Sequence, residues 1–166
     1  MNAFPSAEAT ARPTTVRQAS YCPGMAHDAS AAAILAWLDQ EDRHVTEIIR
    51  RHGCFLQYVL ADEGQPPFTY TVGLFGLGHP ELIVFGLDAR SSASVLNTFY
   101  DRVRNGSDLT PGEVVTPWGG SVAFLVEEFP DAGSTLLAAN RHYQRPAEAS
   151  VPAYRLNWTL DGGFTR

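Results

Sequence analysis

Two apolar runs joined by a short glycine-containing loop constrain the fold of this chain more than any other feature. Residues 68–74 alternate between larger apolar side chains and small or hydroxyl ones, and residues 82–87 are apolar on both faces. These patterns are typical of a half-buried strand and of a strand covered on both sides. The link at 75–81 is too short for the crossover helix that parallel neighbours require. The sequence therefore predicts two adjacent antiparallel strands near the centre of a sheet.

Apolar periodicity and turn signals predict the remaining elements. Helical spacing indicates helices at residues 30–52, 91–104 and 131–143. Short apolar runs between turns indicate strands at residues 54–60, 114–116, 121–128 and 154–160. The polar insert at 39–44 leaves open a division of the first helix into two. This order favours an α+β fold with a largely antiparallel sheet, curled or closed into a small split-barrel-like β-barrel, and about three flanking helices.

The chain divides into an arm and one domain. Residues 1–26 are rich in Ala, Pro, Ser and Thr and lack an apolar period, which predicts a flexible N-terminal arm. Residues 27–166 are enough for a single α+β domain with its own core. The arm is either a solvated tail or a segment that lies over a pocket or a neighbouring subunit, and the second alternative implies a homodimer.

Charge and composition exclude several classes of function. With 18 acidic and 12 basic residues the net charge is -6, which disfavours binding to nucleic acid and to anionic membranes. All basic residues are arginine, so a Schiff-base or P-loop lysine is excluded. Two cysteines, no membrane-length apolar run and no signal-peptide pattern predict a cytoplasmic protein.

The loop at 75–81 is the candidate site of chemistry. Successive amides around Gly76 and Gly78 can converge on an anion. His79 is a candidate acid or base, and Glu81 is its orienting partner or a second carboxylate, because residues two apart share a face of a strand. The alternatives are that the glycines only turn the chain and that His79 satisfies loop carbonyls.

Five further residues are candidate ligand contacts. Tyr70 and Thr71 precede the loop and can border a pocket, and Trp158 can supply an aromatic wall for it. Arg141, or alternatively Arg145, can clamp a phosphate or carboxylate of a ligand, and His142 stands beside Arg141. The alternatives are that Tyr70 belongs to the core and that Arg141 and His142 complement the end of their helix.

No metal site is predicted, because the histidines and cysteines lack the spacing of a ligand set. A free cysteine most often behaves as a small buried apolar residue, and this is the structural interpretation of Cys54 at the start of a strand. A nucleophilic Cys54 would require a histidine base brought close by the fold.

Several segments resemble a bacterial family catalogued as domain of unknown function 4262. They lie within about residues 42–166 and read PPFTYTVGL (66–74), HPELIVFGL (79–87), Leu96-Asn97, Pro111-Gly112 and LNWTLDGGF (156–164). The resemblance implies a bacterial source and no particular activity. This chain departs from the family pattern in two places. Cys22 to His27 lacks the second thiol of the usual CxxCDH run, and Gly53-Cys54 replaces Gly-Trp.

The predicted order of elements is also similar in topology to split-barrel flavin reductases and pyridoxamine-phosphate oxidases. Such barrels hold flavin at a dimer interface, so flavin is the cofactor this analogy raises, although the sequence carries no flavin motif. The leading hypothesis is a small-molecule-modifying enzyme of bacterial metabolism, specialised metabolism included, that uses acid/base chemistry beside the 75–81 loop. The alternative is a non-catalytic ligand-binding or protein-interaction module.

Overall fold

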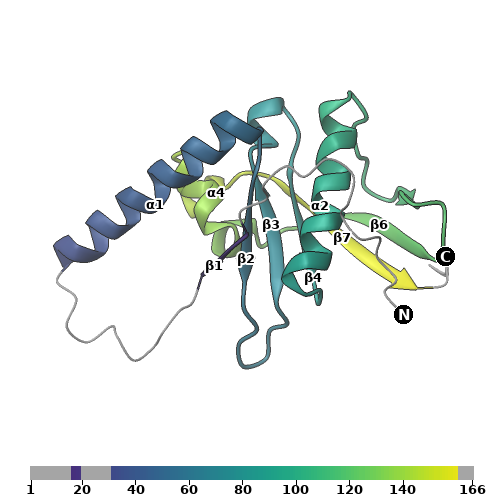
Figure 1. Ribbon diagram of the computed structural model, residues 1–166, viewed down its shortest axis with the longest axis horizontal. Helices are drawn as coiled ribbons and strands as arrows, with labels where there is room; N and C mark the ends of the chain where they lie inside the picture. The colour runs from purple at the N-terminus through teal and green to yellow at the C-terminus, as the bar shows by residue number, and fades with distance from the viewer. Residues whose placement is uncertain (1–15, 20–30, 161–166) are drawn as a thin grey trace.

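The computed structural model describes residues 16–19 and 31–160 of the chain (Figure 1). Its strands form one sheet in the order β1-β2-β3-β4-β7-β6-β5. Their bounds are β1 Val16–Ala19, β2 Phe55–Val59, β3 Phe68–Val72, β4 Glu81–Phe85, β5 Val114–Val115, β6 Val122–Glu128 and β7 Ala153–Leu160. The antiparallel pairing of β3 with β4 confirms the prediction from their short link.

Four α-helices accompany the sheet within the described residues. They are α1 Ala31–His52, α2 Ala89–Arg104, α3 Ala132–Thr135 and α4 Leu137–His142, and short 3-10 turns occupy Phe75–Leu77 and Ala147–Ala149. The polar insert at 39–44 does not divide α1, which is continuous. The helix predicted at 131–143 is instead broken at Leu136, which separates α3 from α4.

The sheet is open, neither closed nor strongly curled, so the expectation of a curled sheet or small barrel was wrong. It is mixed and mostly antiparallel: only β1 with β2 and β4 with β7 pair in parallel. The last strand, β7, lies between β4 and β6 and so joins the β2-β3-β4 meander to the β5-β6 hairpin. Because helices cover both faces, the sheet buries its apolar side chains without closing on itself.

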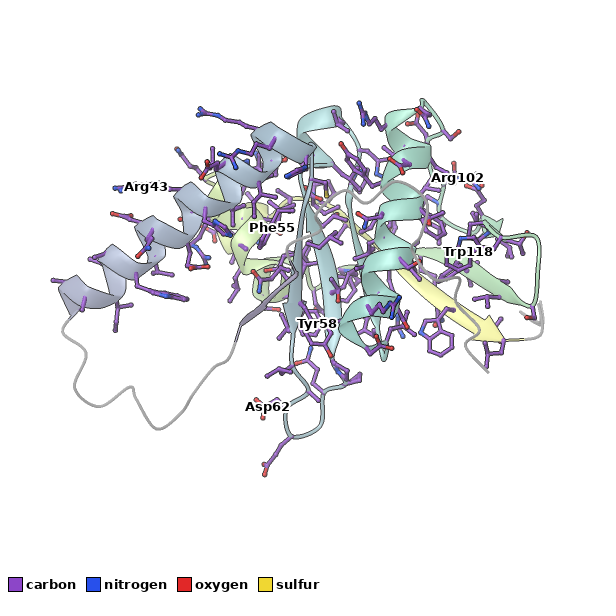
Figure 2. The ribbon with its side chains drawn as sticks, in the orientation of Figure 1. Arg43, Phe55, Tyr58, Asp62, Arg102 and Trp118 are labelled. Atoms are coloured by element: carbon purple, nitrogen blue, oxygen red, sulfur yellow. The ribbon has the colours of Figure 1, made fainter. Side chains whose placement is uncertain are left out.

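Two separate apolar cores lie against the sheet. One joins α2 to the sheet through residues such as Phe99 and Phe124. The other joins α1, α3 and α4 to the sheet through residues such as Val45, Leu136 and Tyr70. In Figure 2, Phe55 lies inward between α1 and the strands, whereas Arg43 points from α1 away from the rest of the described chain.

Part of the predicted N-terminal arm has regular structure. Val16–Ala19 form β1, which pairs in parallel with β2 at one edge of the sheet. The other residues of the predicted arm, 1–15 and 20–26, lie outside the described residues. Among the helices of the described chain, none combines the length and the apolar character needed to cross a membrane.

Candidate functional site

Glu81 begins β4 as a carboxylate with no exposed surface. Its Oε1 accepts hydrogen bonds from the N–H groups of Gly73 at 2.9 Å and Phe75 at 3.1 Å. Its Oε2 accepts from the Thr71 hydroxyl at 2.6 Å and from the Leu74 N–H at 3.3 Å. Burial raises the pKa of Glu81 to about 7, while these four donors act in the opposite direction. The carboxylate thus occupies a nest of loop amides.

The remaining amides of the loop are also bonded within the chain. The Gly76 N–H donates to the Tyr143 hydroxyl at 3.1 Å. The N–H groups of residues 77–79 donate to the carbonyls of Leu74 and Phe75. The structure therefore contains a nest of amides, but residues 73–75 form it rather than Gly76 and Gly78, and its anion is the chain's own carboxylate. Neither Gly76 nor Gly78 has an amide directed at an external ligand.

His79 is held inside the protein with 4% of its surface exposed. Its Nε2 accepts a hydrogen bond from the Leu109 N–H at 3.3 Å, so Nδ1 carries the hydrogen and donates to the Pro80 carbonyl at 2.6 Å. The ring also packs edge-on against Tyr154. Both nitrogens have partners other than Glu81. This geometry matches the alternative of a histidine that satisfies loop backbone groups.

Tyr70 and Thr71 lie on β3 and are fully enclosed. The Tyr70 hydroxyl accepts from the Ala138 N–H at 3.1 Å, in the first turn of α4, and burial raises the pKa of Tyr70 to about 12. The Thr71 hydroxyl donates to Glu81 and accepts from the Leu82 N–H at 2.8 Å. Tyr70 is a core residue that also orients α4, and Thr71 links the ends of β3 and β4.

Cys54 precedes β2 and lies near the same carboxylate. Its thiol donates to the Phe55 carbonyl at 3.5 Å. Burial, and then the negative charge of Glu81, raises the pKa of Cys54 well above its usual range. A thiol that remains protonated is a poor nucleophile, so the geometry favours the structural interpretation of Cys54.

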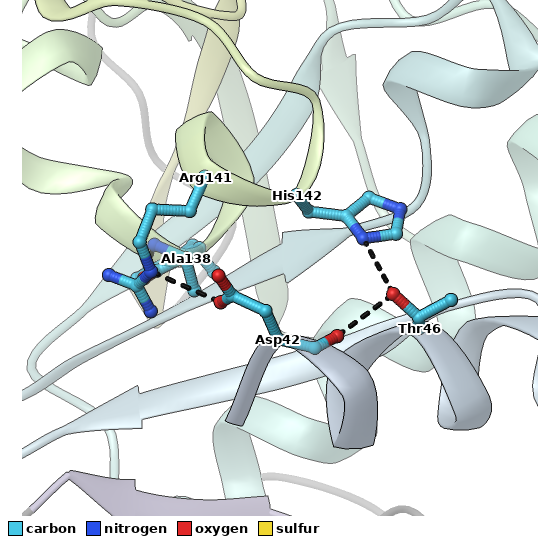
Figure 3. Close-up of polar contacts among 6 residues, drawn as sticks. Asp42, Thr46, Ala138, Arg141 and His142 are labelled. Carbon is cyan, nitrogen blue, oxygen red and sulfur yellow. Dashed lines mark hydrogen bonds and ion pairs between the residues drawn. The ribbon is translucent and has the colours of Figure 1, made fainter. Parts of the chain in front are cut away.

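Arg141 and His142, in the last turn of α4, face α1 (Figure 3). The Arg141 Nε donates to the Asp42 carboxylate at 3.1 Å. The His142 Nδ1 lies 3.4 Å from the hydroxyl of Thr46, which itself donates to the Asp42 carbonyl at 2.8 Å. Burial lowers the pKa of His142, and the charge of Asp42 raises it to a smaller extent. These two residues tie α4 to the middle of α1.

Trp158 lies on β7, and its Nε1 donates to the Phe85 carbonyl at 2.9 Å. It packs against the core on the α2 side of the sheet, whereas Tyr70 belongs to the core on the α1 side. The structure therefore does not bring these two aromatic residues to one pocket wall. The predicted ligand residues are divided between the two faces of the sheet.

The amino-terminal part of α1 is the described surface that stands out most for its apolar character. Its exposed side chains include Ile34 at 47%, Leu35 at 63% and Trp37 at 57%. In Figure 1 this part of the helix extends away from the other labelled elements. We call residues 31–38 the α1 end. Scattered exposed apolar residues are ordinary, but a group of three large ones within one helical turn is typical of a contact surface.

Sequence reasoning missed three partners that define these contacts. Asp42 and Thr46 lie almost a hundred residues before their partners in α4, and Leu109 lies thirty residues after His79. Leu109 contributes its backbone N–H, and the identity of a side chain in the sequence does not indicate which backbone group will bond to a distant residue. Only the tertiary structure identifies such a partner.

The fold and these contacts define an α+β domain with an open, mostly antiparallel sheet and a closed polar network at the β3–β4 loop. Across residues 16–19 and 31–160, no three His, Cys, Asp or Glu side chains are grouped closely enough to hold a metal. The chain belongs to the family described as Domain of unknown function (DUF4262), whose model matches residues 48–164. This match confirms the family resemblance. Comparison with curated proteins and with solved structures gives no match.

Proposed function

We propose that this domain is a non-catalytic protein-interaction module and that the α1 end is its contact surface. The observation that carries the proposal is the exposure of three large apolar side chains, Ile34, Leu35 and Trp37, within one turn of a helix. Leaving such residues in water forfeits about 1.5–3 kcal/mol for each side chain that a partner would cover. A helix that lays its apolar face against a partner is a common recognition mode.

The polar network of the β3–β4 loop supports the same proposal. Each predicted chemical group there already has partners within the chain: Glu81 has four donors, and both ring nitrogens of His79 are engaged. A substrate would have to displace these bonds, and an unmet buried polar group costs about 1–3 kcal/mol. The loop is therefore better suited to stabilising the end of the sheet than to catalysis.

Site-specific photo-crosslinking in the cells that naturally make the protein tests the proposal. A photoreactive residue at Leu35 should give a discrete crosslinked product, because this position lies within the contact. The matched control is Gln40, which is exposed on the polar face of the same helix. Crosslinked products are separated by mass and identified by peptide sequencing.

Two results contradict the interaction proposal. One is the absence of any crosslinked product from Leu35 at native protein levels. The other is the same set of products from Leu35 and Gln40, since a helix that merely collides with abundant proteins would not distinguish its two faces.

We propose, as a second candidate, a small-molecule-modifying enzyme of bacterial metabolism in which Glu81 is the acid or base. The pKa of Glu81, about 7, favours it, because a group that titrates near neutral pH suits proton transfer. Opening of the loop would have to expose the carboxylate, and Arg141 would then hold the ligand. A flavin or another small molecule is the expected ligand class.

Native mass spectrometry of protein purified from its own cells tests this candidate. A retained small molecule that is lost on Arg141→Ala, but kept on Arg104→Ala, would support it. Arg104 is the matched control because it is an exposed arginine in the last turn of α2, which packs on the other side of the sheet. Protein that retains no small molecule in the wild-type form would count against this second function.

A further inference from the structure

We propose that the α1 end binds the α1 end of a second copy of this chain, with the two helices antiparallel. This inference rests on the proposed interaction function, and it names the partner. It is carried by the pattern of burial along α1, by the distribution of charge along that helix and by the position of the α1 end relative to the rest of the protein.

One apolar stripe runs the length of α1. Ile34, Leu38, Val45 and Ile48 recur at the spacing that places residues on one face of a helix. The protein's own core covers the second half of the stripe, where Val45 is 3% and Ile48 9% exposed. The first half continues in the same direction, and Ile34 stays 47% exposed. A partner that covers the exposed half of this stripe therefore needs an apolar stripe of its own about two helical turns long.

The charges along α1 favour self-pairing. The α1 end contains no charged side chain, and Asp39 and Glu41 follow immediately after it. Two α1 ends can therefore meet without bringing like charges to the centre of the contact. In an antiparallel pair, the acidic residues of one helix lie beside the amino terminus of the other, where the helix dipole is positive. A parallel pair would place acidic residues beside acidic residues.

The shape and the overall charge of the protein point the same way. The α1 end extends away from the sheet and the other helices (Figure 1). The helix contacts α4 farther along, where Asp42 forms an ion pair with Arg141 (Figure 3). Two copies joined antiparallel place their bodies at opposite ends of the helix pair. Each chain carries a net charge of -6, so copies repel each other in general. An uncharged projecting segment is where that repulsion is smallest.

The size of this contact determines how strong the dimer can be. Eight helical residues span about 12 Å, and a pair of such segments buries less than the roughly 800 Å² per partner of a standard stable interface. We therefore expect a weak dimer that forms reversibly at about 0.1–1 mM protein and dissociates at lower concentration.

Sedimentation equilibrium of the full chain over this concentration range tests the proposal. The wild type should pass from monomer to dimer, and Ile34→Glu should weaken association at least about tenfold, because it brings a carboxylate into an apolar contact on both copies. Gln40→Glu is the matched control, since it adds the same charge on the polar face and should leave association unchanged. Circular dichroism should show equal helix content in all three proteins, because both positions are exposed in the monomer.

Disulfide trapping tests the orientation. In an antiparallel pair centred on Ala36, residue 34 of one copy lies opposite residue 38 of the other, so the two members of the apolar stripe in the α1 end meet each other. A mixture of Ile34→Cys and Leu38→Cys chains should oxidise mainly to the mixed 34–38 product, with the wild-type chain as the control for its native cysteines. Predominant 34–34 and 38–38 products would overturn the antiparallel arrangement.

The outcomes separate this inference from the function on which it rests. A wild-type chain that stays monomeric at every concentration overturns the second-copy proposal. If Leu35 then still gives a crosslinked product with a different protein, the interaction function stands and only the identity of the partner was wrong. A Leu35 product of twice the chain mass supports both, and the absence of any product together with a monomeric chain overturns both.

Discussion

At the scale of single residues, Glu81 and His79 have hydrogen-bond partners that their spacing along the chain did not predict. The sequence marked Glu81 and His79 as a pair because they stand two apart beside a strand. In the structure each side chain is used by a different part of the protein: Glu81 binds the amides of residues 73–75, and His79 accepts from Leu109. Spacing along the chain indicates which side chains can meet, but it does not reveal competing backbone donors.

The buried carboxylate predicts a pH-dependent stability. The pKa of Glu81 is about 7 in the folded protein and 4.5 for an ordinary glutamate, so the folded state binds more protons between these pH values. The stability from this residue is then fully present below pH 4.5 and is lost as pH rises through 7, by about 3 kcal/mol in total. Urea unfolding of wild type and Glu81→Gln from pH 5 to pH 8 gives the free energy of unfolding of each protein. The wild type should lose stability relative to Glu81→Gln as the pH rises.

The control for this prediction is Glu63→Gln, which alters an exposed glutamate in the turn between β2 and β3. Its unfolding free energy should follow that of the wild type at every pH. A difference between wild type and Glu81→Gln that does not vary with pH would mean that the four hydrogen bonds outweigh burial and keep the carboxylate ionised throughout.

At the scale of elements, the approach of the β3–β4 loop to the start of β2 depends on Gly73. Its φ of +142° is a conformation that other residues rarely adopt. A Cβ at Gly73 would lie 2.7 Å from the Gly53 carbonyl oxygen, which is a backbone atom that cannot easily move. The loop can therefore reach the Glu81 carboxylate only because residue 73 has no side chain.

Gly73→Ala should accordingly destabilise the protein by more than about 2 kcal/mol, or prevent folding, since backbone strain and a steric clash add together. The matched variant is Gly78→Ala in the same loop. Gly78 also has a positive φ, +83°, but a Cβ there meets nothing within 4 Å, so it should cost only about 1–2 kcal/mol. Equal losses in urea unfolding would argue against the close approach of Gly73 to Gly53.

The helices differ in how well periodicity predicted them. The start of α2 follows from Asp88, whose carboxylate accepts from the N–H groups of Arg90 and Ser91. The helix predicted at 131–143 breaks at Leu136, a fully buried residue. Burial of Leu136 in the core on the α1 side accompanies this break, and such packing is not visible in the spacing of apolar residues.

At the scale of the whole molecule, the position of β7 decides the architecture. The predicted α+β class agrees with the structure. The predicted order of elements agrees except for two differences, the additional strand β1 and the division of the third helix into α3 and α4. The insertion of the last strand between β4 and β6 is a long-range pairing that no local pattern encodes. It leaves β1 and β5 as the two edges of an open sheet. The predicted barrel was therefore an extrapolation from the order of elements, and that order does not specify which strands lie side by side in the sheet.

Burial at this scale also explains the two halves of α1. The same apolar period runs through both halves of this continuous helix, although the polar insert at 39–44 had left its division into two helices open. The body of the protein reaches only the second half, through α4 and the sheet. Whether an apolar residue of α1 belongs to the core or to an exposed surface depends on whether other elements of the chain pack over it.

The sequence by itself determined the class of fold, the antiparallel β3–β4 pair, the family and most element boundaries, because these depend on local periodicity, turn residues and short links. The tertiary structure decided that the sheet stays open, that Glu81 is bound by its own loop and that the α1 end remains uncovered within the described chain. These features depend on contacts between residues far apart in the chain. Which groups become buried or hydrogen-bonded there is determined by how the elements pack together.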